Sequence, residues 1–337
     1  MRRTDRAASA LHGRSAAVDA RLDRCRHGGV VVPDYEGYCF ANVPRTVGDV
    51  LDVDVGRSLP EDTLVGVETD VSHVVVVILD GLGWDRFHRD RDDHRFLSRL
   101  GERAAVTPLT SVLPSSTASA VTTAHTGATP AEHGVFGWDV RLPDNDVTVE
   151  AFLHEYHDAL ASVTAQLSQA LYDDLDGETA AETLLMVTAD HGLVDLEPGP
   201  AGCIDVLSVE GVADALARGP SGEPVHPWGD HRLLHLAVQR GEQNRVRAAL
   251  ESRGVTVFTR EEVRELGLYG PATTSALDRR CGSAFDQRCG DLVCTHPDRK
   301  LVSPSNRKAV PKIGMHGGPT ARETLVPFAA ARLSELR

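Results

Sequence analysis

The feature that most constrains how this chain of 337 residues can fold is the apolar run from Val74 to Leu79, which ends abruptly in Asp80. The β-branched and aliphatic residues of this run predict a fully buried strand. The run from Thr183 to Ala189 repeats the arrangement and ends in Asp190 and His191. In an open α/β sheet, ligands bind just outside the carboxyl ends of the strands. Two buried strands that each deliver a carboxylate or an imidazole at that end predict a metal site.

Predicted strands and helices alternate along most of the chain. Strands are expected near residues 73–79, 104–110, 183–189, 232–238 and 291–295, and helices near 90–102, 118–125, 150–176, 242–252 and from about 320. Thr259 and Glu262 have the spacing of a capping box, and Gly127 fits the end of the helix near 118–125. The alternation predicts an α/β fold with a mostly parallel central sheet and helices on both faces.

The composition limits the partners that the chain can have. The net charge is −14 and the isoelectric point is about 5.5, which argues against nucleic-acid binding because such surfaces are basic. Lysine occurs only at positions 300, 308 and 312, and aromatic residues make up 5% of the chain. An acidic, lysine-poor surface is typical of a salt-adapted, halophilic protein, since high salt screens charge repulsion.

The chain offers no segment that predicts a membrane or export role. No apolar run approaches the roughly 18 residues of a membrane span. The first 28 residues are rich in arginine and alanine and lack the apolar core of a secretory signal. We therefore expect a cytoplasmic protein with no membrane partner. Residues 1–28 are expected to form a disordered arm, followed by a single catalytic domain over 29–335.

Four pieces of the sequence supply the groups that metal-assisted phosphoryl chemistry needs: Asp80, Thr117, Asp190 with His191, and His316. A divalent metal lowers the pKa of a hydroxyl and polarises a phosphoryl oxygen. Thr117 is expected at a helix start, where the positive end of the helix favours a bound phosphate. By contrast, Asp230-His231 comes before its predicted strand and is interpreted as part of a turn.

In their residues and in their order along the chain, these pieces resemble the alkaline phosphatase superfamily, in particular its type I phosphodiesterase/nucleotide pyrophosphatase branch. The resemblance covers most of the chain from about residue 29 to 330. It rests on the segments VILDG (77–81), LPSSTASA (113–120), TG (126–127), PAEHG (130–134), VTADHG (187–192) and MHGG (315–318).

The resemblance implies a three-layer alkaline-phosphatase-like fold. It also implies a hydrolase of phosphoric esters that acts on a small-molecule diester or nucleotide rather than on a monoester. The family's nucleophile lies ten residues before the glycine of the Thr-Gly pair, which selects Thr117 as the residue that forms a covalent intermediate. Ser116 and Ser115 remain the alternatives.

The resemblance also implies a divalent metal site with a defined set of ligands. Asp80, Asp190 and His191 would hold the metal that activates Thr117, and His316 would belong to a second metal. Zinc is the usual ion of the family, and manganese is the alternative.

The sequence departs from the family at the second metal. The family supplies an aspartate and a histidine four residues apart, from a segment that is unusually short here, near 138–150. Glu150 and His154 have this spacing and would share a helix face; the alternative is that both are solvated residues at a helix start. If they are, the chain is a catalytically impaired or truncated member of the family. A phosphomonoesterase, or another phosphoryl-transfer enzyme on the same fold, is the remaining alternative.

Overall fold

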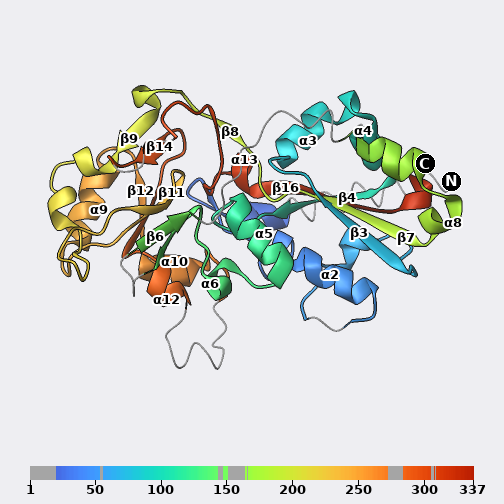
Figure 1. Cartoon of the computed structure of the whole chain (residues 1–337), viewed down its shortest axis with the longest axis horizontal. Coiled ribbons are helices and arrows are strands. Elements are labelled where there is room, and N and C mark those ends of the chain that lie inside the picture. Colours follow the sequence, from blue (N-terminus) through green and yellow to red (C-terminus); the bar gives the residue numbers. More distant parts are fainter. Residues whose placement is uncertain are drawn as a thin grey trace. The chain divides into compact units, whose positions relative to one another are not determined.

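The structure is a computed structural model that describes residues 20–53, 56–142, 147–150, 164, 166–271, 284–304, 307 and 309–337. Contacts between residues divide the chain into two compact units, and both units are discontinuous in sequence. The first comprises Met1–Ser111, Glu155–Gly192 and Leu325–Arg337, and the second comprises Val112–His154 and Leu193–Thr324. Figure 1 shows the elements of both units.

The first unit is built on a four-stranded sheet with the order β3-β7-β16-β4. These strands are β3 (His73–Ile78), β7 (Thr183–Thr188), β16 (Leu325–Arg332) and β4 (Ala105–Thr110). β3 and β7 are parallel, whereas β16 is antiparallel to both β7 and β4. As a result β3, β7 and β4 all run in one direction, as the alternating pattern predicts.

Helices lie on both faces of this sheet. In Figure 1, α3 (Trp84–Asp90) and α4 (Arg95–Arg103) are on one face and α2 (Val43–Val50) is on the other. The unit also contains β1 (Arg26–His27), β2 (Val30–Val31), α8 (Gly177–Ala181), a π-helix at Ser168–Asp174, and 3-10 turns at Phe40–Asn42, Glu61–Leu64, Arg91–Asp93 and Leu333–Glu335.

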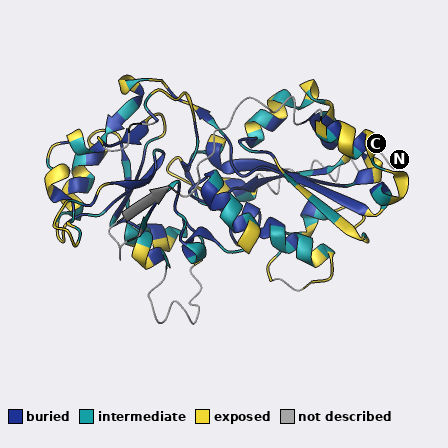
Figure 2. Cartoon of the chain, in the orientation of Figure 1, coloured by how far each residue is buried: buried dark blue, intermediate teal, exposed yellow. Residues whose placement is uncertain are grey.

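The prediction that the strand at 74–79 is fully buried is wrong. β3 lies at the edge of its sheet, and Val76 and Ile78 are 38% and 37% exposed. β7 lies between two neighbours and is buried along its whole length, as Figure 2 shows. A continuous apolar run fits both positions, because the pattern carries no information on how many strands flank it.

The prediction of a helix from about residue 320 is also wrong beyond the first turn. The short helix α13 (Ala321–Thr324) gives way to β16, whose alanines are buried between β4 and β7. Pro327 pairs with Pro108 on the edge strand β4, and pairing with β7 begins only at Phe328. The missing N–H of Pro327 therefore removes no bond to β7, which explains how a central strand tolerates a proline.

The second unit is built on a six-stranded sheet with the order β12-β13-β11-β10-β5-β6, and all its pairings are antiparallel. Its strands are β12 (Thr256–Thr259), β13 (Leu292–Thr295), β11 (Leu233–Leu236), β10 (Trp228–Asp230), β5 (Asp139–Leu142) and β6 (Val147–Glu150). A core cluster that includes Leu234, Val246 and Val257 joins this sheet to α9 (Gln243–Glu251).

The remaining elements of the second unit include two smaller sheets, a parallel pair and an antiparallel pair. These are β9 (Cys203–Asp205) with β14 (Lys300–Val302), and β8 (Val194–Asp195) with β15 (Gly314–Met315). The helices are α5 (Thr117–Thr126), α6 (Pro130–His133), α10 (Arg260–Leu266) and α12 (Ala284–Arg288), with 3-10 turns at Pro200–Gly202, Val206–Ser208 and Ala213–Ala215. The predicted capping box of Thr259 and Glu262 is confirmed at the start of α10.

Part of the predicted N-terminal arm lies within the described residues. Arg21 forms a bidentate ion pair with Asp34, with nitrogen–oxygen distances of 2.6 and 2.9 Å, and Leu22 is buried. Residues 20–28 therefore take part in the first unit, and residues 1–19 lie outside the described residues. No helix in the described part of the chain is long and apolar enough to cross a bilayer.

Candidate active site

The parallel register of β3 and β7 places two carboxylates at one edge of the first sheet. Ile78 pairs with Thr188, so Asp80 and Asp190 each follow the last paired residue by two positions. Ligand atoms of Asp80, Asp190 and His191 lie within 4.8 Å of one another. Asp190 and His191 are buried and Asp80 is half-buried. The structure thus brings together the three residues predicted to hold the activating metal.

The carboxylate of Asp190 is held by the backbone around it. Its Oδ1 accepts the N–H of Gly81 at 3.2 Å and the N–H of His191 at 2.9 Å. Gly81 has a φ of +66°, a conformation that glycine adopts without steric strain, and the tight turn brings its N–H back towards Asp190. The hydroxyl of Ser111 donates to the carbonyl of Asp190. The bonds from Gly81 and His191 orient the carboxylate, and the bond from Ser111 holds the backbone that carries it.

The imidazole of His191 is oriented as a metal ligand needs to be. Its Nδ1 lies 2.9 Å from the carbonyl oxygen of Gly192, a contact that a protonated Nδ1 satisfies as a donor. This tautomer leaves the lone pair on Nε2, which lies 3.4 Å from Asp190 Oδ2. A histidine that donates its other ring N–H to a carbonyl is the usual arrangement at metal sites.

The donor set fits a divalent cation. Asp80 and Asp190 bring two carboxylates close together where Asp190 is 1% exposed. Two carboxylates in a buried place repel each other unless a proton or a cation compensates them. Oxygen and imidazole ligands suit zinc and manganese alike.

In the second unit, Thr117 is the first residue of α5. Ser116 precedes the helix with extended backbone angles, and Gly127 ends it with a φ of +66°, so the predicted helix stop is confirmed. The two alternative nucleophiles are fully buried: Ser115 donates its hydroxyl to the carbonyl of Gly318 at 2.6 Å, and Ser116 donates to Ser119 Oγ at 3.5 Å. Thr117 is half-buried, which makes it the most accessible of the three.

His316 lies in a loop that follows β15, and its surroundings were not all foreseen. Its ring packs against Trp138 with a centroid separation of 6.5 Å. Asp230 Oδ1 accepts the N–H of Trp138 at 3.2 Å, and a Cβ added to Gly317 would lie 3.1 Å from Asp230 Oδ2. The interpretation of Asp230-His231 as part of a turn holds for His231, which follows β10 in the turn to β11, whereas Asp230 ends β10 and is 3% exposed.

Sequence reasoning missed Asp230 because its partners come from distant segments. Gly137 and Gly317 both have left-handed φ values, +116° and +107°, and both leave room for the same carboxylate. The one signal in the sequence was a pair of glycines: Gly137, which precedes Trp138, and Gly317 of the His-Gly-Gly motif. A glycine alone does not indicate which side chain occupies the space beside it.

The residues predicted to complete the second metal site are placed differently from the prediction. Glu150 is the last residue of β6, opposite Asp139, and so does not begin a helix. The β-branched residues Val147, Thr148 and Val149 favour a strand here. His154 lies outside the described residues. Within the described part of 150–176, Ser168–Asp174 form a π-helix.

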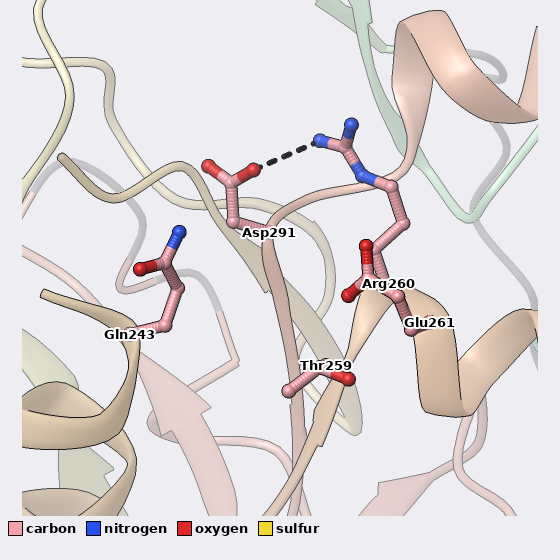
Figure 3. Close-up of a pocket in the computed structure, with 5 residues that line it drawn as sticks. All are labelled: Gln243, Thr259, Arg260, Glu261 and Asp291. Atoms are coloured by element: carbon pink, nitrogen blue, oxygen red, sulfur yellow. Dashed lines mark hydrogen bonds and ion pairs between the residues drawn. The ribbon is translucent and has the colours of Figure 1, made fainter. Parts of the chain in front are cut away.

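A hollow elsewhere in the second unit contains none of the predicted site residues. It is lined by Gln243, Thr259, Arg260, Glu261 and Asp291 (Figure 3). The guanidinium of Arg260 pairs with Asp291 at 3.1 Å and donates to the carbonyl of Gly290 at 3.3 Å. These charges already satisfy each other, so we assign this hollow no role.

Comparison with known proteins supports those motifs that lie before residue 160. Residues 74–159 match the model of the type I phosphodiesterase / nucleotide pyrophosphatase family. No curated protein matches the sequence.

Among solved structures, human ectonucleotide pyrophosphatase / phosphodiesterase 5 is similar with a TM-score of 0.52 and 13% identity, over 77% of this chain and 87% of that one. The murine protein gives 0.49 and 13%, over the same shares. Phosphonoacetate hydrolase from Sinorhizobium meliloti 1021, in complex with phosphonoacetate, gives 0.48 and 17%, over 79% and 94%. At such identities the likeness to the human protein shows a shared fold, and the predicted alkaline-phosphatase-like α/β fold is confirmed.

Proposed function

We propose that this chain is a metal-dependent phosphodiesterase of the alkaline phosphatase superfamily with Thr117 as its nucleophile. Its residues 74–159 match the type I phosphodiesterase / nucleotide pyrophosphatase family. The family match gives the coarser class, a hydrolase of phosphoric esters. The observation that carries the metal dependence is the cluster of Asp80, Asp190 and His191, whose ligand atoms lie within 4.8 Å of one another.

The proposed roles follow from the chemistry of the side chains. A divalent metal held by Asp80, Asp190 and His191 would lower the pKa of a nearby hydroxyl and offset the charge of a phosphate. Thr117 Oγ1 attacks phosphorus, the P–O bond to the first alcohol breaks, and that alcohol leaves with a proton. Water then attacks the phosphorylated Thr117 and releases the second product. We assign zinc to the site, with manganese as the alternative, and His316 to a second metal.

The position of Thr117 at the start of α5 supports this role. The first N–H groups of a helix have no partner within the helix and, with the helix dipole, favour a bound anion. Donors that are already in place when negative charge develops on the phosphoryl oxygens stabilise the transition state. Ser115 and Ser116 are buried and their hydroxyls are engaged, so they are poorer candidates for the attack.

The test is hydrolysis of bis(p-nitrophenyl) phosphate and p-nitrophenyl phosphate by the purified chain at high salt, with zinc or manganese added. Thr117→Ala should abolish turnover, whereas Thr117→Ser, which keeps a hydroxyl, should retain part of it. The diester should be the better substrate. Equal turnover by wild type and Thr117→Ala would remove Thr117 from the mechanism.

A second candidate is an impaired family member that lacks the second metal. The observation that favours it is Glu150, which ends strand β6 rather than beginning a helix with His154. Metal content separates the two candidates. Two zinc ions per chain after dialysis support the complete enzyme, and one ion with turnover near background supports the impaired one.

A further inference from the structure

A fully satisfied polar network lies beside the loop that carries His316. Arg232 and Glu323 are both completely buried and form a bidentate ion pair, with nitrogen–oxygen distances of 2.9 and 3.0 Å. The other three donors of Arg232 bind the carbonyls of His296, Pro297 and Arg299 at 2.6, 2.9 and 2.6 Å. A guanidinium has five donors in total. Arg232 therefore has none left for a substrate phosphate.

Glu323 uses its remaining capacity on the residues that follow His316. Its Oε1 accepts the N–H of Gly318 at 3.0 Å, and its Oε2 accepts the hydroxyl of Thr320 at 2.6 Å. A Cβ on Gly318 would lie 2.8 Å from both carboxylate oxygens, so glycine is needed for this approach. The carboxylate thus holds the backbone two residues beyond His316.

The same loop is tied to the segment that leads into α5. The carbonyl of Gly318 accepts the hydroxyl of Ser115 at 2.6 Å, and Thr324 Oγ1 also donates to it at 3.4 Å. Ser115 is buried and lies two residues before Thr117. A chain of hydrogen bonds therefore runs from Glu323 through the peptide groups of Gly318 to the residues that precede the candidate nucleophile.

We infer that Glu323, whose carboxylate is completely buried and bonded to Arg232, Gly318 and Thr320, is a positioning residue that sets the geometry of both His316 and Thr117. The inference rests on the proposed function for the roles of those two residues. Buried polar networks with every donor and acceptor satisfied are rigid. Misplacement of a reacting group by about 1 Å lowers rates on the order of 100-fold. Rigidity here would therefore act on the reaction and not only on stability.

The variants are chosen to keep the fold. Removing Glu323 outright would leave the charge of Arg232 buried and unpaired. Glu323→Asp keeps that charge but withdraws the carboxylate from Gly318, and Ser115→Ala removes the tie to the Thr117 segment. The matched control is Tyr269→Phe, which deletes a buried hydrogen bond to His235 (3.0 Å) in the core of the same unit.

The first readout is independent of activity and of metal. In histidine-13C-labelled protein, the ring signal of His316, assigned with His316→Gln, should broaden or split in Glu323→Asp and Ser115→Ala. The His316 signal should stay single in Tyr269→Phe, even where this variant loses as much melting temperature as Glu323→Asp and Ser115→Ala. An unchanged His316 signal in Glu323→Asp would overturn the inference.

The second readout is the diester kinetics. We expect kcat to fall on the order of 10-fold or more in Glu323→Asp and Ser115→Ala, with KM little changed, as for an interaction expressed in the transition state. If kcat instead falls in proportion to the loss of melting temperature in all three variants, Tyr269→Phe included, Glu323 has only a structural role. If the wild type is inactive while the His316 signal behaves as expected, the proposed function fails and the positioning role stands.

Discussion

Asp80 and Asp190 leave the sheet of the first unit at the same level, because Ile78 and Thr188 are partners in parallel strands two residues earlier. The parallel register, rather than either strand alone, brings the two carboxylates and His191 together. Negative charges this close in a buried place destabilise the metal-free protein, and a cation reverses that effect.

Asp190→Asn tests this relationship. The amide keeps an oxygen that can accept the N–H groups of Gly81 and His191 but removes the charge. Without metal, the melting temperature should be equal to or higher than that of the wild type, because repulsion with Asp80 is gone. Zinc affinity, measured by competition with a chelating dye, should fall about 10-fold or more. Unchanged zinc affinity would exclude Asp190 as a ligand.

How much of this site the sequence predicts depends on how local each signal is. Asp80 and Asp190 follow apolar runs, and α5 ends at Gly127, so short segments are enough to locate them. Asp230 is different, because its partners Gly137 and Gly317 are remote in sequence. β16 is likewise a strand because β4 and β7 flank it, and its alanine-rich sequence favours a helix by propensity. In both cases, contacts between segments that are distant in the sequence decide the structure, and the local sequence does not reveal them.

His235 should make stability depend on pH. Burial among aromatic rings lowers its pKa from 6.5 to about 3. Gly290 N–H binds Nδ1 at 3.1 Å, which requires the neutral ring. The His235 ring therefore binds a proton less readily in the folded protein than in the unfolded chain. The stability that the neutral ring provides is fully present above pH 6.5 and is lost as the pH falls towards 3.

The expected loss from His235 between pH 7 and pH 5 is about 2 kcal/mol of unfolding free energy. Urea unfolding at both pH values measures it. His235→Gln should be less stable than the wild type at pH 7, and its unfolding free energy should depend less on pH. His133, whose pKa burial lowers to about 4, adds a slope of the same sign. An equally steep profile in His235→Gln would contradict the assignment.

Gly317→Ala should destabilise the second unit and disturb His316. The added Cβ would lie 2.9 Å from Asp230 Cβ, at a φ of +107° that L-residues rarely adopt. We expect a loss of about 1–3 kcal/mol in unfolding free energy. Gly314→Ala is the control, because it lies in the same segment and has no atom within 4 Å of its added Cβ.

The double variant Gly317→Ala/Asp230→Ala separates the clash with the Asp230 carboxylate from the other causes of that loss. Removing the carboxylate relieves the 3.1 Å contacts of the added Cβ with Asp230 Cγ and Oδ2 but leaves the contact with Asp230 Cβ and the backbone strain. The double variant should therefore lose less than the sum of the two single variants. Strict additivity would show that the clash with the carboxylate of Asp230 contributes nothing, and that the contact with Asp230 Cβ and the backbone conformation account for the need for glycine.

Salt should raise the stability of the whole chain. The chain has 49 acidic residues against 35 lysines and arginines, a net charge of −14. Exposed ion pairs such as Arg95–Asp173 are weakened by salt, which acts in the opposite direction. Such exposed pairs contribute little individually. Repulsion among the excess carboxylates acts over the whole surface and is screened once the Debye length falls to about 3 Å near 1 M salt. The melting temperature should therefore rise between 0.1 and 1 M potassium chloride. Sucrose of equal osmolality, which screens no charges, is the control and should raise the melting temperature less. A decrease with salt would show that the ion pairs dominate and that the acidic composition is not an adaptation to salt.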